Sequence, residues 1–68
     1  MQAGDKVINH VARYRRQVGV TQEELATAVN VTRQTIISIE KGNYVPSVLL
    51  ALKLARYFKL PMEKVFSL

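Results

Sequence analysis

The chain has 68 residues, of which 49% are hydrophobic and 22% are charged, and it contains no cysteine. This composition predicts one small globular domain, residues 1–68, with little room for an enclosed catalytic pocket, and it excludes disulfides and thiolate metal sites. Ten Lys and Arg against five Asp and Glu give a net charge of +5, which favours a polyanionic partner such as nucleic acid.

Gly, Pro and Asn residues divide the chain into five short segments, and each has helical rather than strand character. We expect Gly19 to end the first helix, residues 5–18. The apolar stripe of this helix consists of Val7, Val11, Tyr14 and Val18.

The second and third segments begin with residues that cap helices. Thr21 and Glu24 form a capping box, in which each side chain accepts a hydrogen bond from the backbone N–H of the other residue. Thr32 is the cap expected for the third helix. The residues expected to face the core are Leu25, Ala26, Val29, Ile36 and Ile39.

The fourth helix is expected to run from Ser47 to about Lys59, and the fifth to start near Pro61. Residues 48–60 are the longest apolar-rich stretch, but they are too short to cross a bilayer and carry Lys53 and Arg56. Without a membrane span or a signal peptide, we expect a cytoplasmic protein with no membrane partner. The fold predicted overall is all-α with five short helices.

Residues 21–40 carry the most informative pattern. Two short helices are joined by a turn at residues 29–31, and the small side chain of Ala26 permits a close helix crossing. Val31 and Ile36 can fill the space between the two helices. This pattern is typical of a helix-turn-helix, whose second helix lies in the major groove of DNA.

The sequences TQEELA (21–26), VTRQTI (31–36) and IEKG (39–42) closely resemble the lambda-repressor-like, Cro-type (XRE) helix-turn-helix family. The similarity continues through residues 46–47, 50–55 and 65–66, and covers nearly the whole chain from about Val11. It implies a sequence-specific, double-stranded DNA-binding transcriptional regulator that acts by operator occupancy, in the compact subfamily with the five-helix domain alone. No cofactor, metal, small-molecule site or enzymatic activity is expected.

The resemblance also implies roles for individual residues. The recognition-helix residues expected at base edges are Thr32, Arg33, Gln34 and Ser38. The residues expected at phosphates are Gln22, Thr35, Lys41, Asn43 and Tyr44. Arg15 and Glu40 match a buried or half-buried ion pair that ties the first helix to the end of the third.

Elementary chemistry supports these roles. Arg suits guanine and Gln suits adenine as bidentate partners, and Arg33 and Gln34 follow each other in the first turn of the recognition helix. A carboxylate at a helix C-terminus opposes the helix dipole, which favours a cationic partner for Glu40. Other interpretations stay open. Arg33 and Gln34 can be ordinary solvated helix residues, and Lys41 can be a cation that stabilises the end of a helix. Ile37 departs from the family pattern and either packs or contacts a thymine methyl, with packing preferred.

The C-terminal third carries more apolar residues than one small core can absorb, which suggests a partner surface. We expect a homodimer interface formed by Leu49, Leu60, Met62, Val65, Phe66 and Leu68. The competing interpretation is that these residues close the monomer core and that dimers form only on DNA.

Two other function classes fit the sequence less well. An antitoxin-like or anti-activator module would bind a protein through the surface of residues 49–66, but it would not need Arg33, Gln34 and Lys41 at their positions. An enzyme is disfavoured because the chain has no nucleophile–base set and no metal constellation. His10 is the only histidine, and we expect an exposed or half-buried helix residue there.

Overall fold

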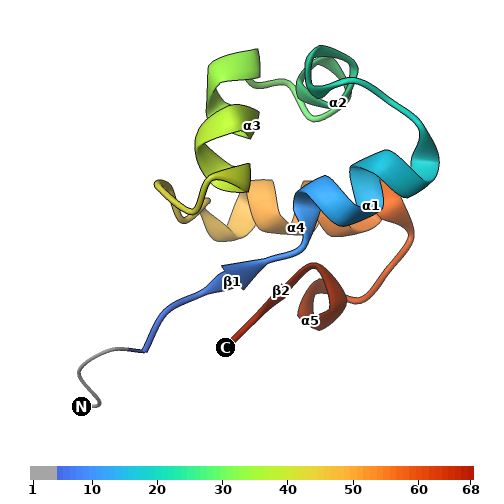
Figure 1. Cartoon of the computed structure of the whole chain (residues 1–68). Helices are drawn as coiled ribbons and strands as arrows, with labels where there is room; N and C mark the ends of the chain where they lie inside the picture. Colours follow the sequence, from blue (N-terminus) through green and yellow to red (C-terminus); the bar gives the residue numbers. More distant parts are fainter. Residues whose placement is uncertain (1–4) are drawn as a thin grey trace.

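A computed structural model describes residues 5–68, so the first four residues of the predicted domain lie outside the described part. In chain order its elements are β1 (Ile8–Asn9), α1 (Val11–Val18), α2 (Gln22–Ala28), α3 (Arg33–Glu40), α4 (Val48–Phe58), α5 (Met62–Val65) and β2 (Phe66–Ser67) (Figure 1). The five helices confirm the predicted fold class, to which the structure adds one pair of short strands.

The helix starts are set by side chains that the sequence identified. Thr21 Oγ1 accepts from the backbone N–H of Glu24 at 3.0 Å, and Glu24 Oε1 accepts from the N–H of Thr21 at 2.8 Å. Thr32 and Ser47 cap α3 and α4 through the side-chain bond alone, accepting from the backbone N–H of Thr35 and of Leu50 at 3.2 Å. These bonds satisfy backbone donors that the first turn of a helix leaves free, so the three predicted starts are confirmed.

Two helices end in the left-handed backbone conformation. Gly19 has a φ of 86° and ends α1, as predicted. Lys59, with a φ of 59°, ends α4 in the same conformation. This conformation costs energy for a residue with a side chain, and the composition around Lys59 gives no signal for it.

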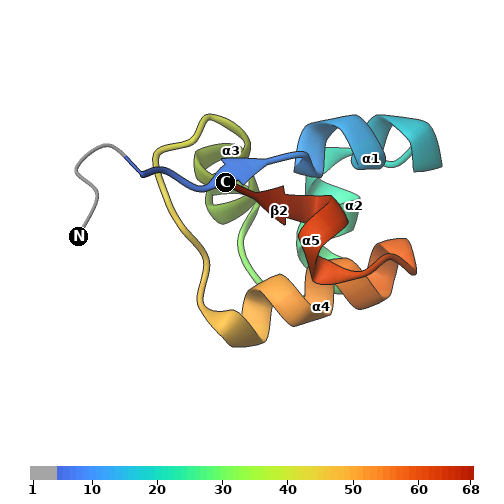
Figure 2. The same cartoon turned by 90° about the horizontal axis from the view of Figure 1, so that it is seen from below.

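The first helix is shorter than the periodicity predicted. It begins at Val11 rather than near Asp5, because Ile8 and Asn9 pair antiparallel with Ser67 and Phe66. Figure 2 shows the two strands side by side. The N–H of His10 donates to the Val65 carbonyl at 2.8 Å. The chain ends are therefore tied together by a pairing that no local pattern could indicate.

The hydrophobic core joins all five helices. Its buried members are Val11, Leu25, Ala26, Val29, Ile36, Ile39, Leu50, Leu54, Ala55 and Val65. Of the predicted first stripe only Val11 is fully buried, whereas Val7 and Val18 are exposed. Val31 packs against the core and Ile36 is fully buried, in agreement with their predicted place between α2 and α3.

Aromatic side chains extend the core at the end of α4. The Phe58 ring lies 6.0 Å from that of Tyr14 and 5.4 Å from that of Tyr57, measured between ring centroids. Such tilted and edge-on pairs add to the stabilisation from burial. Within residues 5–68, no helix is both long enough and apolar enough to cross a membrane.

Candidate nucleic-acid interface

Helix α3 has one buried and one accessible face. Ile36 and Ile39 point into the core, while Arg33 and Gln34 are exposed in the first turn. Thr35, Ile37 and Ser38 are half-buried. The inward pair anchors the helix on the core, so the polar side chains at its start project from a fixed scaffold.

The loop after α3 lies beside this accessible face. Gly42 takes a φ of 79°, a conformation that glycine adopts without strain. The N–H of Asn43 then donates to the Ser38 carbonyl at 2.9 Å. This turn brings the exposed residues Asn43 and Tyr44 back alongside the helix.

Between α3 and this loop lies an open depression of about 260 Å³. It is lined by Thr32, Gln34, Thr35, Ser38, Asn43 and Tyr44. All six were predicted from the sequence as base-edge or phosphate residues. Arg33, Lys41 and Gln22 do not line it, although Arg33 and Lys41 are exposed.

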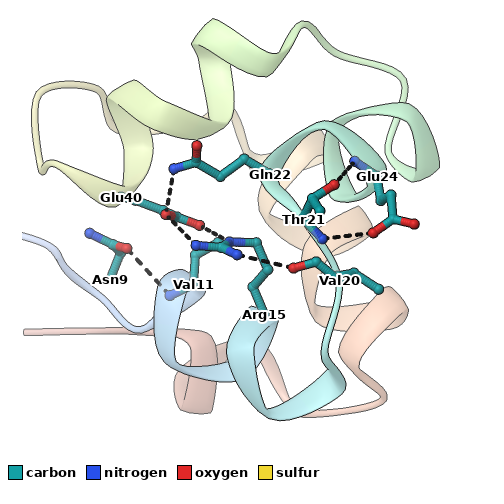
Figure 3. Close-up of polar contacts among 8 residues, drawn as sticks. All are labelled: Asn9, Val11, Arg15, Val20, Thr21, Gln22, Glu24 and Glu40. Atoms are coloured by element: carbon teal, nitrogen blue, oxygen red, sulfur yellow. Dashed lines mark hydrogen bonds and ion pairs between the residues drawn. The ribbon is translucent and has the colours of Figure 1, made fainter.

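The orientation of α3 is fixed by a polar network at its C-terminal end (Figure 3). Arg15 Nε donates to Glu40 Oε2 at 2.7 Å, and Arg15 Nη2 donates to Glu40 Oε1 at 3.2 Å. Gln22 Nε2 donates to the same Oε1 at 3.0 Å. One carboxylate at the end of α3 thus holds both α1 and the start of α2.

The ion pair is largely shielded from water, since the side chains of Arg15 and Glu40 are only 13% and 8% exposed. Burial by itself raises the pKa of Glu40. The hydrogen bonds from Arg15 and Gln22, together with the charges of Arg15 and Arg16, outweigh burial and lower that pKa below its ordinary value. The pKa of Arg15 is raised, chiefly by its hydrogen bond to Glu40. Both groups therefore stay charged at neutral pH.

Sequence reasoning missed one member of this network. Arg15 Nη1 also donates to the backbone carbonyl of Val20 at 3.0 Å, which fixes the link between α1 and α2. Every residue has a backbone carbonyl, so the identity of residue 20 could not indicate this hydrogen bond. The sequence predicted Gln22 at phosphate, and in the structure its amide N–H₂ group donates to Glu40 at the end of α3.

The apolar residues predicted to form an interface divide into three groups. Leu49 and Leu68 are exposed, at 65% and 83%. Leu60, Met62 and Phe66 are half-buried and pack against the core. Val65 is fully buried within one chain, so its predicted place in an interface is corrected: a partner cannot reach this side chain.

A groove of about 250 Å³ lies beside these residues and is strongly apolar. It is lined by Val7, Val45, Pro46, Val48, Ala51, Met62 and Phe66. Val45 and Val48 are more than half exposed. The predicted interface did not include Val7, Val45 or Val48, which come together here through the strand pair and the loop before α4.

His10 lies directly before α1 rather than within the helix, and its side chain forms no capping hydrogen bond. It is half-buried, with Nε2 3.1 Å from Ser67 Oγ. Across residues 5–68, no three His, Asp or Glu side chains gather in a way that could hold a metal ion.

The helix-turn-helix family model matches residues 11–65. The chain is 53% identical over 58 residues to the uncharacterized HTH-type transcriptional regulator YgzD of Bacillus subtilis, covering 85% of this chain and 88% of that one. A second HTH-type transcriptional regulator, from Methanocaldococcus jannaschii, is 48% identical with the same coverage.

Among solved structures, the chain resembles the restriction-modification controller protein C.AhdI from Aeromonas hydrophila. The TM-score is 0.75 at 25% sequence identity, and the match covers 81% of this chain and 83% of that one. The family match spans the capped helices, the turn and the recognition helix described above. The chain therefore belongs to the lambda-repressor-like, Cro-type helix-turn-helix family of DNA-binding transcriptional regulators.

Proposed function

We propose that this protein binds a specific double-stranded DNA sequence as a homodimer, with α3 in the major groove, and that it regulates transcription by occupying its operator. The observation that carries the proposal is the depression between α3 and the following loop, which brings Gln34, Ser38, Asn43 and Tyr44 to one surface. All six residues that line it carry hydrogen-bonding side chains, which suits the donor and acceptor groups of base edges and phosphates.

In this proposal Arg33 and Gln34 contact base edges, with Thr32 and Ser38 beside them. Both Arg33 and Gln34 are exposed in the first turn of α3, where a helix in the major groove meets the bases. Arg and Gln offer the bidentate hydrogen-bonding geometry that distinguishes guanine and adenine from other bases.

Phosphate contacts surround this base-reading turn. Lys41, Asn43 and Tyr44 are exposed on the loop after α3, and Thr35 lines the same depression. The amide nitrogen of Gln22 donates to Glu40. In this proposal, the amide oxygen of Gln22 and the start of α2 face the DNA backbone on the other side of the major groove. Phosphate contacts of this kind fix the register of a protein on its duplex.

The dimer follows from how little DNA one recognition helix can contact. Two-fold pairing places two recognition helices about 34–36 Å apart, one turn of DNA. The apolar groove supports this pairing, because two of the residues that line it, Val45 and Val48, are more than half exposed. Burying it against its own copy removes apolar area from water.

The experiment is selection of binding sites from a random duplex library with the purified protein, followed by a salt titration of the enriched sequence. We expect a palindromic site with half-sites one turn apart. Affinity should fall with a log–log slope of about −0.9 per phosphate contacted. No enrichment, or an affinity independent of salt, would exclude sequence-specific DNA binding and leave the protein-interaction module as the better hypothesis.

A further inference from the structure

A second basic surface lies on α4, outside the residues assigned to DNA above. Lys53 and Arg56 are three residues apart and therefore share one face of this helix. Together with Asn30 and Tyr57 they line a groove of about 240 Å³ beside the turn between α2 and α3. Within residues 5–68 no carboxylate forms an ion pair with either cation.

This groove is continuous with the candidate DNA surface. Lys53 also lines the neighbouring groove of about 280 Å³, which contains Thr35, Tyr44 and Ser47. Thr35 and Tyr44 in turn line the depression on the accessible face of α3. Shared residues thus connect three hollows into one path from α3 to Arg56.

The path runs beside α3, where the DNA backbone would lie if α3 occupied the major groove. A helix in the major groove is flanked on both sides by phosphates, since the groove is only about 12 Å wide. A DNA strand on the α4 side of α3 that passes Tyr44 would then run alongside α3 towards the N-terminal end of this helix. Asn30 lies just before that end, and Lys53 lines the same grooves as Asn30.

We propose that Lys53 and Arg56 bind phosphates of the DNA flanking the base pairs that α3 contacts, so that one backbone runs along the α3–α4 grooves and out to Arg56. This inference rests on the proposed function, which it extends to flanking DNA. An ammonium and a guanidinium are both suited to phosphate oxygens, the guanidinium in bidentate geometry.

An acidic protein segment would also suit two cations. The continuity with the depression on α3 favours DNA, because a bound duplex would already occupy the adjoining groove at Tyr44 and Thr35. A separate protein ligand would have to share that groove. The experiment below distinguishes the two ligands.

The test uses a random-sequence 24-bp duplex and the full chain, with equilibrium binding measured at several salt concentrations. Lys53→Gln, Arg56→Gln and the double variant are compared with Lys64→Gln. Lys64 is an exposed cation of α5 that lines none of the connected hollows. The control therefore removes one charge without touching the path, and circular dichroism establishes that each variant is folded.

The slope of log affinity against log salt concentration should be less steep for the double variant than for the wild type, by about 1.8 for the two lost phosphate contacts. Between 50 and 200 mM salt, the fold-loss of affinity should therefore be about 12 times smaller for the double variant. Each single variant should show half of this change in slope. On the selected operator, replacing the phosphates that flank the contacted base pairs with neutral methylphosphonates should weaken binding by the wild type but not by the double variant.

A double variant whose slope equals that of Lys64→Gln would overturn this inference, and binding of an acidic peptide to the α4 groove would then be the interpretation to pursue. That result would leave the proposed function intact, since the wild type would still bind DNA with a salt-dependent affinity. Absence of DNA binding by the wild type itself would instead contradict the proposed function and this inference together.

Discussion

Arg15 and Glu40, 25 residues apart in sequence, are joined by two hydrogen bonds of 2.7 and 3.2 Å. Because Glu40 is the last residue of α3, this pair sets the orientation of α3 relative to α1. Arg15 also holds the Val20 carbonyl. A single guanidinium therefore connects α1, the link to α2 and the end of α3.

Glu40→Gln should destabilise the protein far more than Glu23→Gln. Removing one charge of a buried pair leaves the other uncompensated and costs about 3–5 kcal/mol, a large part of the stability of a domain this small. Glu23 is exposed in the first turn of α2, where losing its interaction with the helix dipole costs about 0.3–1 kcal/mol. Urea unfolding followed by circular dichroism measures both free energies. Equal losses would mean that the Arg15–Glu40 pair does not contribute to stability.

The same pair should make stability depend on pH in the acid range. The folded-state pKa of Glu40 lies below its ordinary value. A group with a lowered folded pKa adds stability at pH values above its unfolded pKa, about 4.3, and this contribution is lost as the pH falls through the lower folded pKa. Below about pH 4.5 the wild type should therefore lose free energy of unfolding more steeply than Glu40→Gln.

Urea titrations at successive pH values measure this difference, with Glu23→Gln as the control that keeps the wild-type slope. Parallel curves for the wild type and Glu40→Gln would show that Glu40 has the same pKa in the folded and unfolded states. High salt should have little effect on the difference, because the side chains are only 13% and 8% exposed and buried pairs are weakly screened.

Much of the fold was predictable because its signals are local. The caps Thr21, Thr32 and Ser47 each form the expected bond within three residues. The strand pair was not predictable, since Ile8 and Ser67 are too far apart in sequence for periodicity to relate them. For the same reason the first helix was placed too early, with Val7 assigned to its buried stripe.

The candidate site shows the same division. Residues 32–44 are close in sequence, and six of the residues predicted there line one depression. The apolar surface depends on tertiary packing instead, and that packing takes Val65 into the core while exposing Val48. Hydrophobicity alone could not distinguish these two valines, because both are apolar residues near a helix terminus.

Single substitutions should separate base contacts from phosphate contacts. Arg33→Ala and Gln34→Ala should each lose about 1–3 kcal/mol of discrimination at one base pair while the fold persists. Lys41→Ala should weaken binding to all sequences about equally. Titration of the selected operator, its single-base variants and random DNA measures these effects. If the three variants changed specific and random binding alike, Arg33 and Gln34 would not contact base edges.

Val48→Glu should convert the proposed homodimer into a monomer. Val48 is 69% exposed and lines the apolar groove, so a carboxylate there would be buried without a partner when two copies pair. The first turn of α4 tolerates the substitution, because a negative charge near a helix N-terminus is favourable. Val18→Glu is the control on an exposed valine outside the groove. Val18 ends α1, so the new charge opposes the helix dipole there and costs about 0.3–1 kcal/mol of stability without affecting the groove. Sedimentation equilibrium at micromolar concentration should give a dimer for the wild type and for Val18→Glu, and a monomer for Val48→Glu with weakened operator binding. A wild type that stays monomeric without DNA, combined with unchanged operator binding by folded Val48→Glu, would remove this groove as the dimer interface.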